Sequence, residues 1–264
     1  MATDLHVTSM GQGERLVFVH GSGGWGEESF AEQRELAAQF RVELVDRRGF
    51  GDSPSTSRVD WEVDARDLEA LLDLPAHLVG HSYGAIACLL CAATVPGKVQ
   101  SLTLIEPSTY AVARGQPAVE ALFARMQPLY TAASRMTAVE YFFAVAAAFG
   151  FVDSPMPLPI ELTGKALAAT IASRDERPPW DAEIPLEAIA ACHIPTLLVM
   201  GAWDSVPDSA RSILGTALGA VADVIESRLR AMRVVIPGAH HWPQRSGEAF
   251  NEALEGFLRN VGSP

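Results

Sequence analysis

A five-residue motif, Gly80-His81-Ser82-Tyr83-Gly84, has the residue types of a nucleophilic serine on a tight turn. It spells G-x-S-x-G and directly follows a strand-like run, His77-Leu78-Val79. A serine at the apex of a strand-to-helix turn takes a strained backbone conformation, and glycines on either side leave room for that turn. The apolar run that follows, residues 85–93, suits a buried helix. The motif therefore predicts that Ser82 is a catalytic nucleophile, and the alternative is a purely structural turn.

A serine hydroxyl is a poor nucleophile at neutral pH, so it needs a base within hydrogen-bond reach and an acid that orients the base. In parallel-sheet enzymes, catalytic groups collect at the carboxyl ends of strands. Two later strand-like runs are followed by suitable groups, with Asp204 after residues 195–201 and His241 after residues 232–236. The chain order serine, aspartate, histidine is typical of one such architecture. We predict that Asp204 and His241 complete a triad with the serine.

Alternatives exist for the acid. Asp204 could instead cap the helix that follows it, which is a common role for aspartate near a helix start. Glu106, in Leu104-Ile105-Glu106-Pro107, also stands at the end of a strand-like run, next in the chain to the run that precedes the serine. Glu106 is therefore the alternative candidate for the acid of the triad. If it has no catalytic role, we expect it to be a polar residue of the pocket or of the hinge to the cap.

The negative charge that develops on a substrate oxygen needs backbone N–H donors aimed at it. One donor should be Tyr83 N–H, immediately after the nucleophile, and the other should come from the loop that follows His20-Gly21. Ser22 is the first candidate there and Gly23 the second. This glycine-rich loop lacks the spacing and the lysine of a phosphate-binding loop.

Strand-like and helix-like runs alternate over both ends of the chain. This alternation predicts an α/β fold with a mostly parallel central sheet and helices on both faces. The expected strands are residues 5–10, 15–19, 42–45, 77–79, 99–105, 195–201 and 232–236, and the expected helices are residues 30–40, 60–72, 85–93, 209–219 and 247–261.

Between Glu106 and Ile194 the alternation stops. Helix-like stretches at residues 119–130, 138–149 and 162–173 are separated by prolines, and the region is too apolar to stay solvated as a linker. We therefore expect a core domain formed by residues 1–106 and 195–264, with a helical cap, residues 107–194, inserted into it.

Composition narrows the possible functions. The chain has 264 residues, is 48% hydrophobic and carries a formal net charge of −12 without a lysine or arginine cluster. This argues against a nucleic-acid partner. No run approaches the ~20 apolar residues of a membrane span, and the N-terminus has no signal-peptide pattern. We expect a cytoplasmic protein with a small-molecule substrate, no membrane partner, and Cys88 and Cys91 buried as packing residues.

Taken together, these motifs resemble the α/β-hydrolase family over nearly the whole chain. The matching pieces are the His20-Gly21 loop, the turn Asp46-Arg47-Arg48-Gly49-Phe50-Gly51-Asp52-Ser53, the elbow at Ser82, Gly201-Ala202-Trp203-Asp204 and the late histidine. The resemblance implies the α/β-hydrolase fold with a helical cap and a serine hydrolase without a metal or cofactor. We expect the turn at residues 46–53 to have a structural role that supports the site, because its charges have no chemical task in ester hydrolysis.

The resemblance also bears on the site residues. The family pattern Gly-x-Gly-His, counted from Gly238, places the base at His241, with His240 in place of the second glycine. Some members, including lactone hydrolases that act on zearalenone, take their acid from the position of Glu106. His20 and His81 are expected to shape the loops around the nucleophile.

The expected activity is hydrolysis of a carboxylic ester or lactone of a moderately apolar small molecule through an acyl-enzyme. Carbon–carbon bond hydrolysis of a diketone-like compound uses the same triad and is an alternative, as is a ligand sensor with slow turnover. Apolar residues of the insertion should mostly pack the insertion itself, with a minority lining the pocket; they are Phe123, Met126, Tyr130, Met136, Tyr141, Phe142, Phe143 and Phe149.

Overall fold

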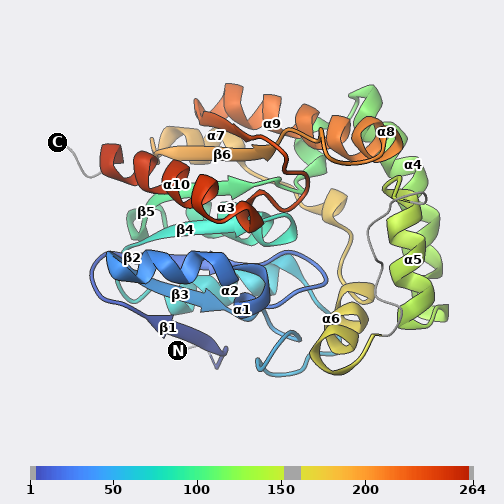
Figure 1. Ribbon diagram of the computed structural model, residues 1–264, viewed down its shortest axis with the longest axis horizontal. Coiled ribbons are helices and arrows are strands. Elements are labelled where there is room, and N and C mark those ends of the chain that lie inside the picture. The colour runs from blue at the N-terminus through green and yellow to red at the C-terminus, as the bar shows by residue number, and fades with distance from the viewer. Residues whose placement is uncertain (1–3, 152–161, 262–264) are drawn as a thin grey trace.

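A seven-stranded sheet forms the centre of the computed structural model, which describes residues 4–151 and 162–261 (Figure 1). The strand order is β1-β3-β2-β4-β5-β6-β7; β1 runs antiparallel to β3 and all other neighbours are parallel. The strands are β1 (Val7–Met10), β2 (Arg15–Val19), β3 (Arg41–Val45), β4 (Ala76–His81), β5 (Val99–Ile105), β6 (Thr196–Gly201) and β7 (Met232–Ile236). The predicted fold class, a mostly parallel sheet in an α/β fold, is confirmed.

Helices cover both faces of the sheet. Successive residues of a strand point to opposite faces, so Phe18 and Val17 of the fully buried β2 belong to different hydrophobic clusters. On the face of Phe18 the sheet packs against η1 (Ala31–Ala38) and α10 (Glu248–Val261). On the face of Val17 it packs against α2 (Trp61–Leu71), α3 (Tyr83–Thr94) and α9 (Thr216–Leu229). This double cover explains the continuous apolar sequence of β2.

The segment between β5 and β6 is helical, as expected. It contains η3 (Tyr110–Ala113), α4 (Pro117–Ala132), η4 (Ala133–Arg135), α5 (Ala138–Ala148), α6 (Gly164–Arg174), η5 (Pro179–Asp181) and α7 (Leu186–Ala191). Helices α4, α5 and α6 lie beyond the carboxyl ends of the strands (Figure 1). We call residues 107–194 the insertion; its division from the core at these residues stays our proposal.

Two elements differ from their predictions. The α-helix expected at residues 30–40 is instead the 3₁₀ helix η1, which follows a one-turn helix α1 (Gly26–Ser29), because a short run of spaced apolar residues does not distinguish 3₁₀ from α geometry. The helix expected at residues 209–219 is α8 (Asp208–Ala210), a π-helical turn η6 (Arg211–Gly215) and then α9, which continues to Leu229. The glycine at its expected end costs only about 1 kcal/mol in a helix, and the burial of Val221 and Ile225 outweighs that cost.

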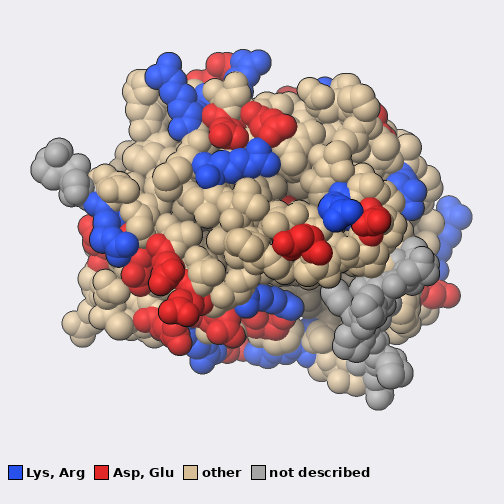
Figure 2. Space-filling model, turned by 45° about the horizontal axis from the view of Figure 1, so that its top comes forward, with Lys and Arg blue, Asp and Glu red and all other residues tan. Residues whose placement is uncertain are grey.

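The remaining short helices are η2 (Pro96–Lys98) and η7 (Pro243–Ser246). As expected, Cys88 and Cys91 are buried in α3, and burial raises the pKa of the Cys91 thiol to about 12. No helix in the described part of the chain is long and apolar enough to cross a bilayer. On the face shown in Figure 2, lysines and arginines are scattered among acidic side chains instead of gathering in one patch.

Candidate active site

Ser82 occupies the sharp turn between β4 and α3. Its φ of 51° and ψ of −116° are an unusual conformation for a residue with a side chain. A Cβ on Gly80 would lie 2.7 Å from Ala85 Cα, and one on Gly84 would lie 2.5 Å from the carbonyl oxygen of His20. The two glycines therefore let the turn pack against its own helix and against the loop after β2, as the motif predicted. The turn places Ser82 at the carboxyl end of β4, near the centre of the sheet.

Ser82 opens into a cavity of about 660 Å³ between the sheet and the insertion. His240, His241 and Trp242 line it from the loop after β7, and Ser22 and Gly23 line it from the loop after β2. Six of the eight apolar residues singled out in the insertion also line it: Phe123, Met126, Tyr130, Tyr141, Phe142 and Phe149. The prediction that only a minority would do so was wrong, because the faces with which α4 and α5 pack together also face the cavity.

His241 is buried, and the rings of its neighbours surround it. Its carbonyl oxygen accepts a hydrogen bond from His81 Nε2 (2.8 Å), and its ring lies 5.0 Å from His81 and 6.4 Å from Trp203. Burial, with help from His81 and His240, holds the pKa of His241 well below its usual value. The imidazole is therefore neutral at neutral pH, the form in which it can act as a base. Its Nδ1 is buried without a partner among the described residues.

Asp204 lies at the surface, after a Trp203 whose φ of 59° turns the chain. Its Oδ1 accepts a hydrogen bond from the backbone N–H of Gly238 (3.0 Å). This contact joins the loop after β6 to the loop after β7. The carboxylate thus has a structural partner in the loop that carries the histidines.

Glu106 is completely buried at the end of β5 and has a φ of 43°. Gly201 N–H (2.6 Å) and Trp203 Nε1 (3.1 Å) donate to its Oε1. Its Oε2 is buried without a partner among the described residues, as is His241 Nδ1. Burial raises the pKa of Glu106 to about 8, although the two hydrogen bonds work in the opposite direction.

The loop after β2 is bound tightly to the insertion. Gly23 N–H donates to Ser173 Oγ (2.7 Å), so this N–H is already engaged within the protein. Ser22 Oγ donates to Glu176 Oε2 (2.5 Å). Of the two predicted donors in this loop, Ser22 is therefore the one whose N–H remains a candidate. Tyr83 N–H belongs to the first turn of α3, where N–H groups have no acceptor within the helix.

Under this loop lies a buried ionic group that we call the Arg47 cluster, composed of Arg47, Asp64 and Glu176. The Arg47 guanidinium donates to Asp64 Oδ2 (2.9 Å), to Glu176 Oε1 (2.6 Å) and to the Gly21 carbonyl oxygen (3.2 Å). All three side chains are almost completely inaccessible to solvent. Burial raises the pKa values of Asp64 and Glu176, and the guanidinium opposes this shift. Sequence patterns gave Glu176 no role, because nothing in its own neighbourhood marks it.

His20 and His81 hold the loops around Ser82, as expected. His20 Nδ1 donates to the carbonyl oxygen of Gly21 (2.7 Å), while its Nε2 accepts from Arg47 N–H (3.0 Å). Burial lowers the pKa of His81 to about 3, so this histidine is neutral and donates to His241 O.

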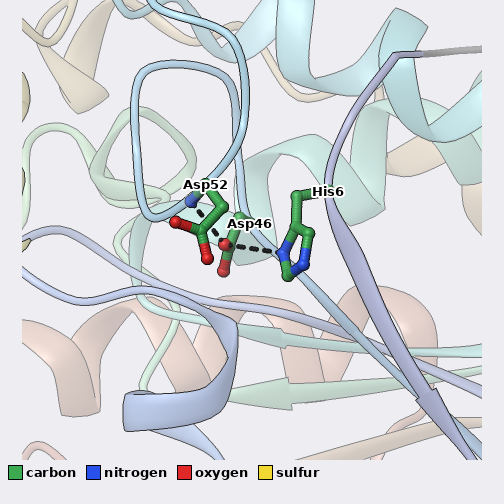
Figure 3. Close-up of side chains that lie close together, drawn as sticks. All are labelled: His6, Asp46 and Asp52. Carbon is green, nitrogen blue, oxygen red and sulfur yellow. Dashed lines mark hydrogen bonds and ion pairs between the residues drawn. The ribbon is translucent and has the colours of Figure 1, made fainter.

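His6, Asp46 and Asp52 bring a histidine and two carboxylates together (Figure 3). The Asp46 carboxylate already accepts from Gly26 N–H (2.7 Å), Asp52 N–H (2.9 Å) and His6 Nδ1 (3.0 Å). These bonds tie the turn at residues 46–53 to His6, the residue before β1, and to α1. The arrangement fits the structural role expected of this turn.

Ser108, on the loop after β5, was not singled out from the sequence. Its Oγ lies 2.9 Å from Ser82 Oγ, and its N–H donates to the carbonyl oxygen of Ser82 (3.2 Å). A lone serine in a loop has no spacing that distinguishes it. The one signal in the sequence is its position two residues after Glu106, which places it in the loop at the carboxyl end of the same strand.

The fold and this geometry match a known family. The model of the alpha/beta hydrolase family matches residues 16–253, which is most of the chain, and the chain belongs to this family. A pimeloyl-(acyl-carrier protein) methyl ester esterase of Chromobacterium violaceum is 40% identical over 105 residues, which are 40% of this chain and 41% of that relative. A probable lysophospholipase of Arabidopsis thaliana, BODYGUARD 1, is 33% identical over 127 residues, 44% of this chain and 27% of the relative. The chain thus spans less than half the length of these relatives.

Solved structures show the same fold over nearly the entire chain. An esterase from Thermogutta terrifontis superposes with a TM-score of 0.69 at 23% identity and covers 98% of this chain and 94% of its own. An N-acyl homoserine lactone degrading enzyme superposes with a TM-score of 0.62 at 23% identity, covering 96% of both chains. At these identities the similarity establishes the fold.

Proposed function

We propose that this protein is a serine hydrolase that cleaves a neutral, moderately apolar carboxylic ester or lactone. The observation that carries the proposal is Ser82 on its strained turn, opening into an apolar cavity that His241 also lines. The esterase named among the relatives, and the family itself, support a hydrolytic reaction.

In the proposed reaction, Ser82 Oγ attacks the carbonyl carbon while its proton passes to His241 Nε2. The negative oxygen of the tetrahedral intermediate is held by Ser22 N–H and Tyr83 N–H, with added stabilisation from the N-terminus of α3. His241 then protonates the leaving alcohol. A water molecule attacks the acyl-enzyme, gives its proton to His241, and releases the acid and the free serine.

For the acid of the triad we propose Glu106 in preference to Asp204. Glu106 Oε2 and His241 Nδ1 are both buried without hydrogen-bond partners among the residues that the structure describes, a costly condition that a bond between them would relieve. Trp203 lies beside both groups, because it donates to Glu106 and its ring lies near that of His241. Asp204, in contrast, is exposed and already accepts from Gly238.

The charges around the cavity support a neutral substrate. Within residues 4–151 and 162–261, three charged residues line it: Glu28, Arg114 and Arg245. Arg245 pairs with Glu28, and Arg114 pairs with Glu120 (2.7 Å). A charged substrate would have to compete with these pairs or remain unpaired in an apolar cavity, which is unfavourable.

The test combines labelling with substitutions. Ser82→Ala and His241→Ala should each lower kcat on p-nitrophenyl butyrate about 10⁴-fold, because triad members act as one unit. Fluorophosphonate labelling should disappear in Ser82→Ala. His240→Ala is the matched control. It removes the neighbouring histidine in the sequence, which is not the proposed base, and should keep most of the activity. Full labelling and activity in Ser82→Ala would refute the proposal.

A further inference from the structure

We propose that Ser108 is a further catalytic residue, which donates a hydrogen bond to the reacting oxygens on the leaving-group side of Ser82. This inference rests on the proposed function. The first observation is contact: Ser108 Oγ lies 2.9 Å from Ser82 Oγ, and both side chains are buried and line the cavity.

The order of the strands places Ser108 opposite the proposed oxyanion donor Ser22. Ser22 follows β2, on one side of the elbow strand β4, whereas Ser108 follows β5 and His241 follows β7, both on the other side. The leaving alcohol and the attacking water exchange protons with His241, so they pass on the side where Ser108 stands. A second hydroxyl there can contact each of them in turn.

Ser108 is held firmly for this role. Its backbone N–H donates to the carbonyl oxygen of Ser82 (3.2 Å), and Ser82 N–H donates to the carbonyl oxygen of Ile105 (2.9 Å). The loop after β5 is therefore tied to the elbow by two backbone bonds. Tyr110 Oη lies 3.5 Å from Ser108 Oγ and is buried beside it.

The role of Ser108 in the reaction follows from which of the two serine hydroxyls donates its proton to the hydrogen bond between them. Either hydroxyl of the Ser82–Ser108 pair can donate to the other. For the Ser82 proton to pass to His241, Ser108 must be the donor, and its bond then stabilises the developing charge on Ser82 Oγ. In the acyl-enzyme that oxygen is part of an ester and accepts poorly, so the Ser108 hydroxyl becomes available to the hydrolytic water. Ser108 keeps its own proton throughout.

The step most dependent on Ser108 should be deacylation when the leaving group is p-nitrophenolate. This anion leaves without assistance, whereas water must be held and activated. We expect Ser108→Ala to lower kcat on p-nitrophenyl butyrate about 10- to 100-fold, the range for loss of a hydrogen bond to a charged group. KM should fall with kcat, because acyl-enzyme that accumulates before a slow deacylation lowers both constants together. Stopped-flow traces should show a burst equal to the concentration of labelled sites, because acyl-enzyme accumulates.

Two further variants and a titration complete the experiment. Ser108→Thr keeps the hydroxyl and should retain most of the activity without a burst. Thr109→Val is the control, because Thr109 is the next residue, is completely buried, and has an Oγ1 without a partner among the described residues. Fluorophosphonate titration gives the concentration of working Ser82 in each variant.

A Ser108→Ala protein with the kcat of Thr109→Val and no burst would overturn the inference. A loss shared by Ser108→Ala and Thr109→Val, with fewer titratable sites in both, would assign Ser108 a structural role and would also overturn it. Absence of labelling in the unaltered protein would instead contradict the proposed function, so the two failures are distinguishable.

Discussion

At the scale of residues, Glu106 and Asp204 differ in their surroundings more than in their chemistry. Both follow strands whose ends meet at the cavity, yet Glu106 is completely buried whereas Asp204 is exposed. Glu106→Gln and Asp204→Asn keep the shape of each side chain and remove its charge. We expect Glu106→Gln to lower kcat about 10³- to 10⁴-fold with little change in KM, because the imidazole loses the partner that fixes its tautomer. Asp204→Asn should cost only a few-fold, and the reverse ranking would restore Asp204 as the acid.

The pH dependence distinguishes the two carboxylates independently. Because burial raises the pKa of Glu106 to about 8, a triad that needs this group ionised should gain kcat as the pH rises through about 8. The folded protein holds this proton more tightly than the unfolded chain does. Its contribution to stability is therefore present below the ordinary pKa of 4.5 and is lost as the pH rises through about 8. Thermal unfolding should accordingly show Glu106→Gln gaining stability, relative to the unaltered protein, between pH 6 and pH 9.

Sequence patterns predicted the site unevenly. The elbow at Ser82 was predictable because two glycines are required by close backbone contacts that no larger residue could make. The spacing from Gly201 located Asp204 in the chain, but side-chain direction depends on Trp203, whose positive φ has no sequence signature. Ser108 was missed for a similar reason, because its partner is 26 residues away.

At the scale of elements, the Arg47 cluster joins the core to the insertion. Arg47 and Asp64 belong to the core and Glu176 to the insertion, and the cluster contains one positive and two negative groups. Strands and helices of the core were predictable from periodicity, but this link was not. It depends on residues 129 positions apart that meet only when the insertion packs onto the sheet.

Substitutions of the positive and of the negative members of the Arg47 cluster should destabilise the fold by different amounts. Arg47→Met should destabilise the fold by about 3–5 kcal/mol, because it leaves two buried carboxylates without a cation. Glu176→Gln should cost only about 1 kcal/mol, since Arg47 and Asp64 remain as a pair. Urea unfolding at pH 7 measures both. The Arg47→Met loss should shrink as the pH is lowered, because the two carboxyls, whose pKa values burial already raises, can then take up protons. Equal losses in the two variants would contradict this account.

At the scale of the whole molecule, overall charge and cavity charge are separate properties. The net charge is −12, yet the charged residues that line the cavity are paired. We expect p-nitrophenyl butyrate to exceed p-nitrophenyl hemisuccinate in kcat/KM by about 100-fold, because a carboxylate would enter an apolar cavity unpaired. Long-range repulsion is screened in 1 M salt, so the preference should persist there. A preference that vanishes in salt would assign it to the net charge instead.

The contacts of the loop after β2 bear on how such an enzyme can be rebuilt. Ser22 and Gly23, which belong to the core, are bonded to Glu176 and Ser173 of the insertion. A chimera that replaced residues 107–194 with the corresponding segment of another hydrolase would change the pocket and would also remove the supports of this loop. Substrate range and catalytic power are therefore not separable modules in this chain. A grafted segment must therefore place a serine at the position of Ser173 and a carboxylate at the position of Glu176.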